Sequence, residues 1–543
     1  MNVIKKIIFF AFAFCLFFSL FAQEVDNDTE AIIPEENQNS IGEEQPFLEL
    51  NRNAIFIIDN IDFKIKGRTR PYALIRYCDL NVGEEIHGIE KLEKYIKDKT
   101  QLLINQRVLS TAKIEYTIGE VRPDEKYPVD MVVTAEDTWN IIAVPYPKYD
   151  SNTGFELILK ARDYNFFGTM NPLRLDIGYK NDQRGKDALI IELESDTPFV
   201  LFGYNWNFYL NNYFNYRPDV EEPFYYKNAT GLSMQLPFKA TTFTFGVEES
   251  LYLNYEHPDS QKPYYTSDFQ KGLFMQSKAY SSWKIPTGIN VFDKGELTYN
   301  VNLSYVITHG FTAWPLAEYL RGSSINMSHS FGFSKIDWVG NYRKGHYAYL
   351  SNGNSYSFYN LQHGDDPLYS SFYIMNKNHF IISDFFGIST FFQYRQWFYH
   401  EPDYYDKAAD ALRGILDNSI TANYMLSLNL DFPLRVLRFY PSEWFKTKKL
   451  KFFDFEMHLS PIIDMALYHD PKTNTSFNFK NMLVSGGGEI ILFPAFMRSL
   501  YLRLSFAWNI IEQFSPTGRK SSKFPYIPIG NNREIFIGIG HHY

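Results

Sequence analysis

The sequence is poor in cysteine, in basic charge and in long apolar runs. It has two cysteines in 543 residues, and Cys15 lies in an N-terminal targeting segment, so a disulfide framework and a cysteine-based zinc site are excluded. The 53 basic side chains are outnumbered by 62 acidic ones, and this net charge of -9 argues against a nucleic-acid partner. After residue 22 there is no run of about 18 apolar residues, which excludes a later transmembrane helix on the usual length rule.

Aromatic residues, in contrast, are abundant. Phe, Tyr and Trp make up 18% of the chain, whereas the charged residues make up only 21%. An apolar content of 45% is too high for a disordered chain. Tyr and Phe are typical of strands and of membrane interfaces, so the composition favours a sheet protein in contact with lipid.

The first 50 residues contain two segments that are not predicted to belong to a folded domain. Residues 1–22 have basic Lys5 and Lys6, an apolar stretch and a small Ala22, which predicts a secretory signal peptide. The alternative is an uncleaved membrane anchor, for which the apolar run is short. Residues 23–50 carry nine acidic side chains and no basic one, which predicts a disordered acidic linker.

Residues 51–145 have the pattern of a small α/β domain. Aromatic and β-branched residues predict strands at 54–66, 112–118 and 129–135. Pro71 can open a short helix that ends near Cys78, and apolar residues at helical spacing predict a longer helix over 88–108. The predicted order is β-α-α-β-β, and Cys78 is interpreted as a buried apolar residue.

Residues 146–543 alternate apolar and polar side chains in segments of roughly ten residues. A soluble β-sandwich is the alternative, but it needs neither about 400 residues of alternation nor aromatic residues near the segment ends. A membrane β-barrel of about 16 antiparallel strands is therefore predicted. The last segment, 533–543, ends on the aromatic Tyr543, which shares a strand face with Ile535, Ile537 and Ile539. Outer-membrane barrels use a terminal aromatic residue in this position as an assembly signal.

Several short motifs give the chain a resemblance to a known family. Ile61-Asp62-Phe63, the run 80–84 and the run 132–136 make residues 51–145 similar to a POTRA domain. Residues 155–168, with their Asn-aromatic-Gly turn, resemble the first barrel strand of the bacterial outer-membrane assembly factors, the Bam, Tam and Sam-type proteins. The resemblance implies an outer-membrane barrel with a POTRA-like domain in the periplasm.

The family's most specific motif is an aliphatic-Arg-Gly-aromatic tetrapeptide in the sixth extracellular loop. The similar run here is Leu412, Arg413, Gly414 and Ile415, in which Ile415 replaces the aromatic residue. The resemblance implies that Arg413 folds into the lumen and pairs with acids on the wall. Asp464 and Glu489 are the candidate partners, and both lie on segments that follow the loop.

The resemblance also implies a lateral seam between the first and last strands, placed at 154–164 and 533–543. The polar content of the first segment and the glycines of the last suggest that this seam is weak. The residues assigned to the seam are Phe155, Glu156, Leu157, Lys160, Arg162, Ile535, Ile537, Gly538, Ile539 and Tyr543.

The sequence carries no catalytic constellation and no Walker, GxSxG or HExxH motif, so neither an enzyme nor a cofactor or metal site is predicted. The resemblance implies a factor that inserts or translocates unfolded outer-membrane polypeptides. Periplasmic chaperones, accessory lipoproteins and outer-membrane lipid are its further expected partners. A passive pore, a surface antigen or adhesin, and a lipid-transport barrel are the alternatives.

Overall fold

The computed structural model describes most of the chain from residue 54 onward. The described ranges are 54–106, 108–150, 154–181, 187–218, 222–238, 241–256, 269–291, 295–313, 322–398, 406–407, 409–416, 420–470, 475–479, 482–496, 501–510 and 533–539. The predicted signal peptide at 1–22, the predicted linker at 23–50 and Tyr543 lie outside the described residues.

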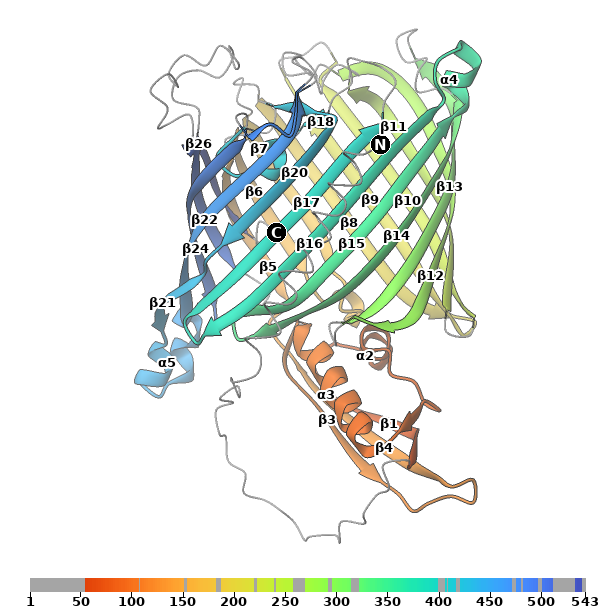
Figure 1. Cartoon of the computed structure of the whole chain (residues 1–543), viewed down its shortest axis with the longest axis vertical. Helices are drawn as coiled ribbons and strands as arrows, with labels where there is room; N and C mark the ends of the chain where they lie inside the picture. Colours follow the sequence, from red (N-terminus) through yellow and green to blue (C-terminus); the bar gives the residue numbers. More distant parts are fainter. Residues whose placement is uncertain are drawn as a thin grey trace.

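An N-terminal α/β domain precedes a barrel and lies beneath one of its ends (Figure 1). Its elements are β1 (Ile55–Lys66), α2 (Pro71–Cys78), β2 (Glu85–His87), α3 (Ile89–Asn105), β3 (Leu109–Ile118) and β4 (Lys126–Asp137). The sheet order is β2-β1-β4-β3, with β1 and β4 parallel. The predicted order of elements is therefore present, with the short β2 added between the helices.

The two helices bury an apolar stripe against this sheet. Leu92 and Leu103 of α3 pack in one core with Phe56, Ile58 and Met131 of the strands. α2 begins at Pro71, whose missing N–H is harmless in the first turn of a helix. None of the helices in the described part of the chain is long and apolar enough to cross a membrane.

The barrel is a closed antiparallel sheet that has 18 strands among the described residues, not about 16. In order they are β5 (Ile141–Asp150), β6 (Gly154–Asp163), β7 (Leu173–Asn181), β8 (Asp187–Leu201), β9 (Tyr204–Tyr216), β10 (Phe224–Phe238), β11 (Thr241–Glu256), β12 (Phe269–Asn290), β13 (Glu296–Ala313), β14 (Gly322–Val339), β15 (Tyr342–Ser357), β16 (Leu368–Ser383), β17 (Phe386–Phe398), β20 (Tyr424–Asp431) continued by β21 (Leu434–Phe439), β22 (Phe455–Asp470), β24 (Leu483–Pro494), β25 (Leu502–Asn509) and β26 (Arg533–Ile539).

The first barrel strand, β5, begins at Ile141, within the range 51–145 predicted for the N-terminal domain. β5 contains Pro145 and Pro147, which are rare inside sheets, so the sequence does not mark this segment as a strand. Smaller elements complete the barrel. They are η1 (Phe166–Gly168), α4 (Phe358–His363), β18 (Asp406–Lys407), η4 (Ala409–Ala411), β19 (Thr421–Ala422), α5 (Pro441–Trp444), η6 (Lys448–Phe453) and β23 (Thr475–Ser476).

The polarity of the barrel wall is inverted relative to a soluble protein. On β22 the polar side chains of Glu456, His458 and Asp464 are buried toward the lumen. Leu459 and Ile463, at the alternate parity, are exposed on the outside. Because apolar side chains face outward and the antiparallel sheet closes on itself, this is the architecture of a membrane-spanning barrel.

Candidate functional site: a buried loop and the barrel seam

The connection between β17 and β20 folds back into the barrel. The short strands β18 and β19 pair with each other at its neck, and η4 follows β18. Leu412 and Ile415 are buried in an apolar cluster with Ile420, Met425 and Leu483. Ile415 therefore packs fully although it replaces the aromatic residue of the motif. The loop is held as a compact internal element by this cluster.

Arg413 is the largest fully buried side chain of this loop, with 1% of its surface exposed. Its Nε donates to Asp464 Oδ2 at 2.9 Å, and its Nη2 donates to Asp464 Oδ1 at 2.6 Å. The backbone N–H of Arg413 donates to the same carboxylate at 2.8 Å. The parallel pair of guanidinium bonds fixes both the position and the orientation of the arginine. The structure thus brings together the two residues that the sequence singled out first.

Further charged groups complete the cluster around Arg413. Glu489 Oε1 lies 3.4 Å from Arg413 Nη1, and Asp431 Oδ1 lies 2.6 Å from Arg413 Nη2. Arg503 Nη1 lies 3.2 Å from the same Glu489 oxygen. Two arginines and three carboxylates thus form one network in the barrel wall. Removing Arg413 would leave Asp464 buried without a cationic partner, which is costly.

Sequence reasoning missed Asp431 and Arg503 as members of this cluster. Both residues belong to the polar set of their alternating strands, so the alternation predicts that they face the lumen. This alternation predicts the same lumen-facing position for every polar residue, and it does not indicate which of these residues contact one another. The pairing of distant strands decides that Asp431 and Arg503 lie beside Arg413.

Gly414 connects the loop to the last strand of the barrel. Its backbone N–H donates to Glu534 Oε2 on β26 at 2.9 Å. Its φ is +87°, and an added Cβ would lie 2.6 Å from the Trp508 nitrogen on β25. Both observations require glycine at this position. The loop is therefore fixed to β22, β24, β25 and β26 together.

The barrel closes between β26 and β5, not between β26 and β6. Phe536 pairs with Asp150 and Ile537 with Tyr149, and these are the two pairs at this junction among the described residues. Gly538 and Ile539 extend β26 beyond them without a β5 partner. β26, which carries Ile535, Ile537, Gly538 and Ile539 of the predicted seam, is one strand of the closing pair, whereas β5 takes the place of the predicted N-terminal strand.

The residues predicted for the N-terminal side of the seam all lie on β6. They are Phe155, Glu156, Leu157, Lys160 and Arg162. Glu156 pairs with Lys148 of β5 at 3.6 Å and with Lys180 of β7 at 2.9 Å. Lys160 and Arg162 both pair with Asp176 of β7. The polar content of this strand therefore joins three neighbouring strands and does not weaken the seam.

Two prolines lie on β5, the strand that closes the barrel. β5 pairs with β6 along all ten of its residues, through Pro145 and Pro147. Neighbouring residues of an antiparallel strand direct their N–H groups to opposite sides, so these two prolines face the same side. Because the β6 ladder is unbroken, that side is the one facing β26. Proline has no N–H to donate, so two successive donors are absent where the seam would continue.

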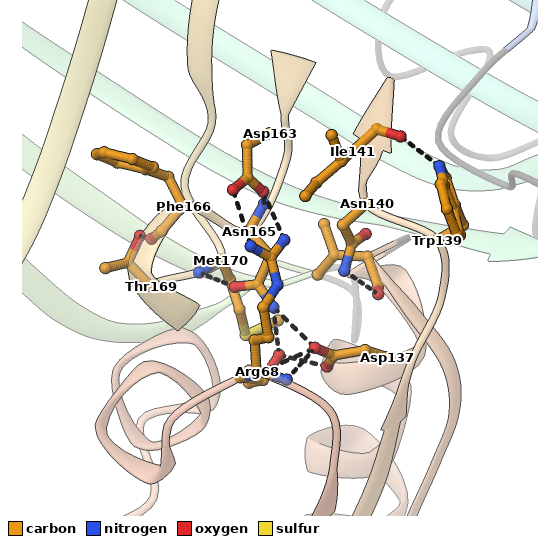
Figure 2. Close-up of polar contacts among 12 residues, drawn as sticks. Arg68, Asp137, Trp139, Asn140, Ile141, Asp163, Asn165, Phe166, Thr169 and Met170 are labelled. Atoms are coloured by element: carbon orange, nitrogen blue, oxygen red, sulfur yellow. Dashed lines mark hydrogen bonds and ion pairs between the residues drawn. The ribbon is translucent and has the colours of Figure 1, made fainter. Parts of the chain in front are cut away.

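A polar joint fixes the N-terminal domain to the barrel (Figure 2). Asn165, after β6, donates to Thr69 Oγ1 at 2.7 Å and to Asp137 Oδ2 at 3.1 Å. Its Oδ1 accepts from the Met170 N–H at 2.8 Å. Arg68 forms a bidentate pair with Asp163, at 3.0 and 2.8 Å. The Asn-aromatic-Gly turn of the sequence is therefore the barrel half of this joint.

A second contact holds the far side of the domain. Asn105, the last residue of α3, donates to Asp337 Oδ1 at 3.0 Å and accepts from the Trp338 N–H at 3.1 Å. Asp337 and Trp338 lie on β14, far around the barrel from β5. Two contacts on different sides of the domain restrict its rotation beneath the barrel.

Comparisons with known proteins give matches in fold only. No family model matches the chain, and no curated protein matches its sequence. BamA from Haemophilus ducreyi lacking POTRA domains 1–3 is similar in structure, at 12% identity and a TM-score of 0.42, over 89% of this chain and 85% of that one. CdiB from Acinetobacter baumannii matches at 11% identity and a TM-score of 0.45, over 89% of this chain and 74% of that one. CdiB from Escherichia coli matches at 10% identity and a TM-score of 0.40, over 93% and 92% of the two chains.

Proposed function

We propose that this protein is an outer-membrane factor that inserts or translocates other polypeptides through a lateral opening of its barrel. The observation that carries the proposal is the seam between β26 and β5, which has two residue pairs among the described residues. Pro145 and Pro147 remove donors from the same edge. An incoming strand can pair with an edge that its own barrel satisfies poorly, because unpaired backbone groups are costly in lipid.

The N-terminal domain has the role of a POTRA domain in this proposal and lies in the periplasm. Its sheet ends on β3, which pairs with β4 on one side only. An unfolded client can add a strand to such an edge through backbone hydrogen bonds. The polar joint at Asn165 keeps this edge at a fixed place near the start of β5, where a client would meet the seam.

The buried loop keeps β26 in place while the seam opens. Gly414 contacts Glu534 of β26, and Arg413 is bound to β22 through Asp464. An opening then separates β26 from β5 and leaves the loop side intact. Unfolded outer-membrane proteins are the clients of this mechanism, with chaperones or accessory lipoproteins as further partners.

A disulfide across the seam tests the mechanism. Tyr149→Cys with Ile537→Cys joins two paired residues whose side chains both face outward. Leu157→Cys with Tyr179→Cys joins β6 to β7 as a matched control. We expect oxidation to abolish client assembly in the seam variant, with recovery after reduction, and to leave the control active. Full activity of the oxidised seam variant would reject lateral opening.

Depletion of the protein separates the proposed role from a passive pore, a surface antigen and a lipid transporter. Quantification of every outer-membrane barrel protein should show a fall in many clients for a general insertase, or in a few for a dedicated transporter. Unchanged levels of all barrel proteins would contradict the proposal. Stable single-channel currents without client dependence would instead favour the pore.

A further inference from the structure

The connection between β21 and β22 forms a projecting element, residues 440–453, termed here the basic-aromatic hairpin. It contains α5 and η6 and lies at the same end of the barrel as the N-terminal domain, to the side of the wall (Figure 1). Four of its aromatic side chains are more than half exposed, with Phe445 at 70%. They are Trp444, Phe445, Phe452 and Phe453. A cluster of exposed aromatic side chains of this kind marks a surface that contacts a membrane or another protein.

Basic residues accompany the aromatic residues in this hairpin. Lys446, Lys449 and Lys451 are exposed beside them. Glu443 is the one acidic residue within 440–453, and Arg438 lies 3.4 Å from it. The hairpin therefore carries net positive charge in a chain whose net charge is -9. Its charge complements an anionic surface.

Other turns at this end of the barrel also end in exposed apolar side chains. Hairpin connections alternate between the two ends, so the turns after β8, β10, β12 and β16 lie at the same end as the hairpin. Each carries an exposed large apolar residue, namely Phe202, Phe238, Ile289 and Phe385, with Phe202 at 85%. These turns extend around the barrel, as a lipid boundary does, whereas a bound protein would cover one sector.

We infer that the basic-aromatic hairpin binds the anionic phospholipid headgroups of the adjacent, periplasmic leaflet. The aromatic rings lie at the boundary between acyl chains and headgroups, the depth that Trp and other aromatic residues prefer. Lys446 and Lys449 contact the headgroup phosphates. Near an anionic surface each lysine strengthens binding by about fivefold. The hairpin thereby gives this end of the barrel a preference for anionic lipid.

A fluorescent label at the hairpin tests this inference on the full-length barrel in nanodiscs. Phe445→Cys is labelled with an environment-sensitive dye, since Cys78 is buried and does not compete. Quenching is measured with spin-labelled phosphatidylglycerol and with spin-labelled phosphatidylethanolamine. Val121→Cys, exposed on the N-terminal domain, is the matched control. Retention of the heat-modifiable band on gels shows that each variant still forms a barrel.

We expect strong quenching at position 445 and none at position 121. Phosphatidylglycerol should quench more strongly than phosphatidylethanolamine, and Lys446→Gln with Lys449→Gln should remove that difference. Equal quenching by both lipids in the unsubstituted hairpin would overturn the preference for anionic lipid. No quenching at position 445 would overturn the membrane contact altogether, and a protein partner would then be the better occupant.

Discussion

β26 has two neighbours in the barrel, and the described residues pair it with each of them to a different extent. Toward β25 it forms seven residue pairs, and the buried loop adds the bond from Gly414 to Glu534. Toward β5 it has two pairs among the described residues, and Pro145 and Pro147 of β5 have no backbone N–H to donate. Among the described residues, β26 is therefore bound more extensively to β25 and to the buried loop than to β5. In the proposed mechanism, such a barrel opens between β26 and β5 and keeps its remaining wall.

Arg413→Ala is expected to have the largest effect, because it weakens the strong side of this comparison. Its removal leaves Asp464 buried without its cation, at a cost of about 3–5 kcal/mol, while Glu489 keeps Arg503. The barrel should still close, while the loop around residues 409–416 becomes sensitive to protease and client assembly falls.

Arg438→Ala is the matched control for Arg413→Ala. Arg438 forms an exposed ion pair with Glu443, and pairs of this kind contribute about 0–1 kcal/mol. Urea unfolding followed by gel mobility measures both variants. Equal stability and full activity of the Arg413 variant would show that the cluster does not organise the loop.

Pro145→Val with Pro147→Val should strengthen the weak side. Each valine restores an N–H toward β26, and a hydrogen bond contributes about 1 kcal/mol. Hydrogen exchange measured by mass spectrometry should show greater protection of β5 and β26, with slower client assembly. Pro237→Val on β10 is the control, since it lies far from the seam. Unchanged exchange at β26 would mean that the prolines do not limit the seam.

Asn165→Ala tests whether the polar joint holds the N-terminal domain, with its proposed client-binding edge β3, in place. It leaves Asp137 and the Met170 N–H without one partner each, at a cost of about 1–3 kcal/mol. Hydrogen exchange around residues 137–141 should increase while the seam is unaffected. Asn81→Ala, an exposed position whose side chain contacts Asp79, should change neither. Equal exchange in both variants would argue against a fixed joint.

The smallest effect concerns Cys78 in the core of the N-terminal domain. Burial raises the pKa of its thiol from 9.0 to about 12, so the thiolate is scarce at neutral pH. Because the folded pKa exceeds the unfolded one, this contribution to domain stability is present below pH 9 and is lost toward pH 12. Iodoacetamide should modify Cys78 at pH 8 only after urea unfolds the domain. Rapid modification of the folded chain would contradict this burial.

Much of the lumen wall could be predicted from alternation alone. On β22, the polar residues Glu456, His458, Ser460 and Asp464 alternate with outward-facing residues in the sequence, and all four are buried in the structure. The predicted strand count is too low in part because β5, with Pro145 and Pro147, lacks the composition of a strand. The seam was displaced for the same reason, since an error in the first strand moves the closing contact onto its neighbour.

The sequence by itself determined which side chains face lipid and which face the lumen, because a strand has a side-chain period of two. It also indicated Arg413 and Asp464, through motifs that are local in the chain. Only the tertiary structure decided that Asp431, Arg503 and Glu534 meet the loop and that β5 closes the barrel. These contacts join residues far apart in the chain, and their geometry follows from strand register and barrel closure, which no local pattern encodes.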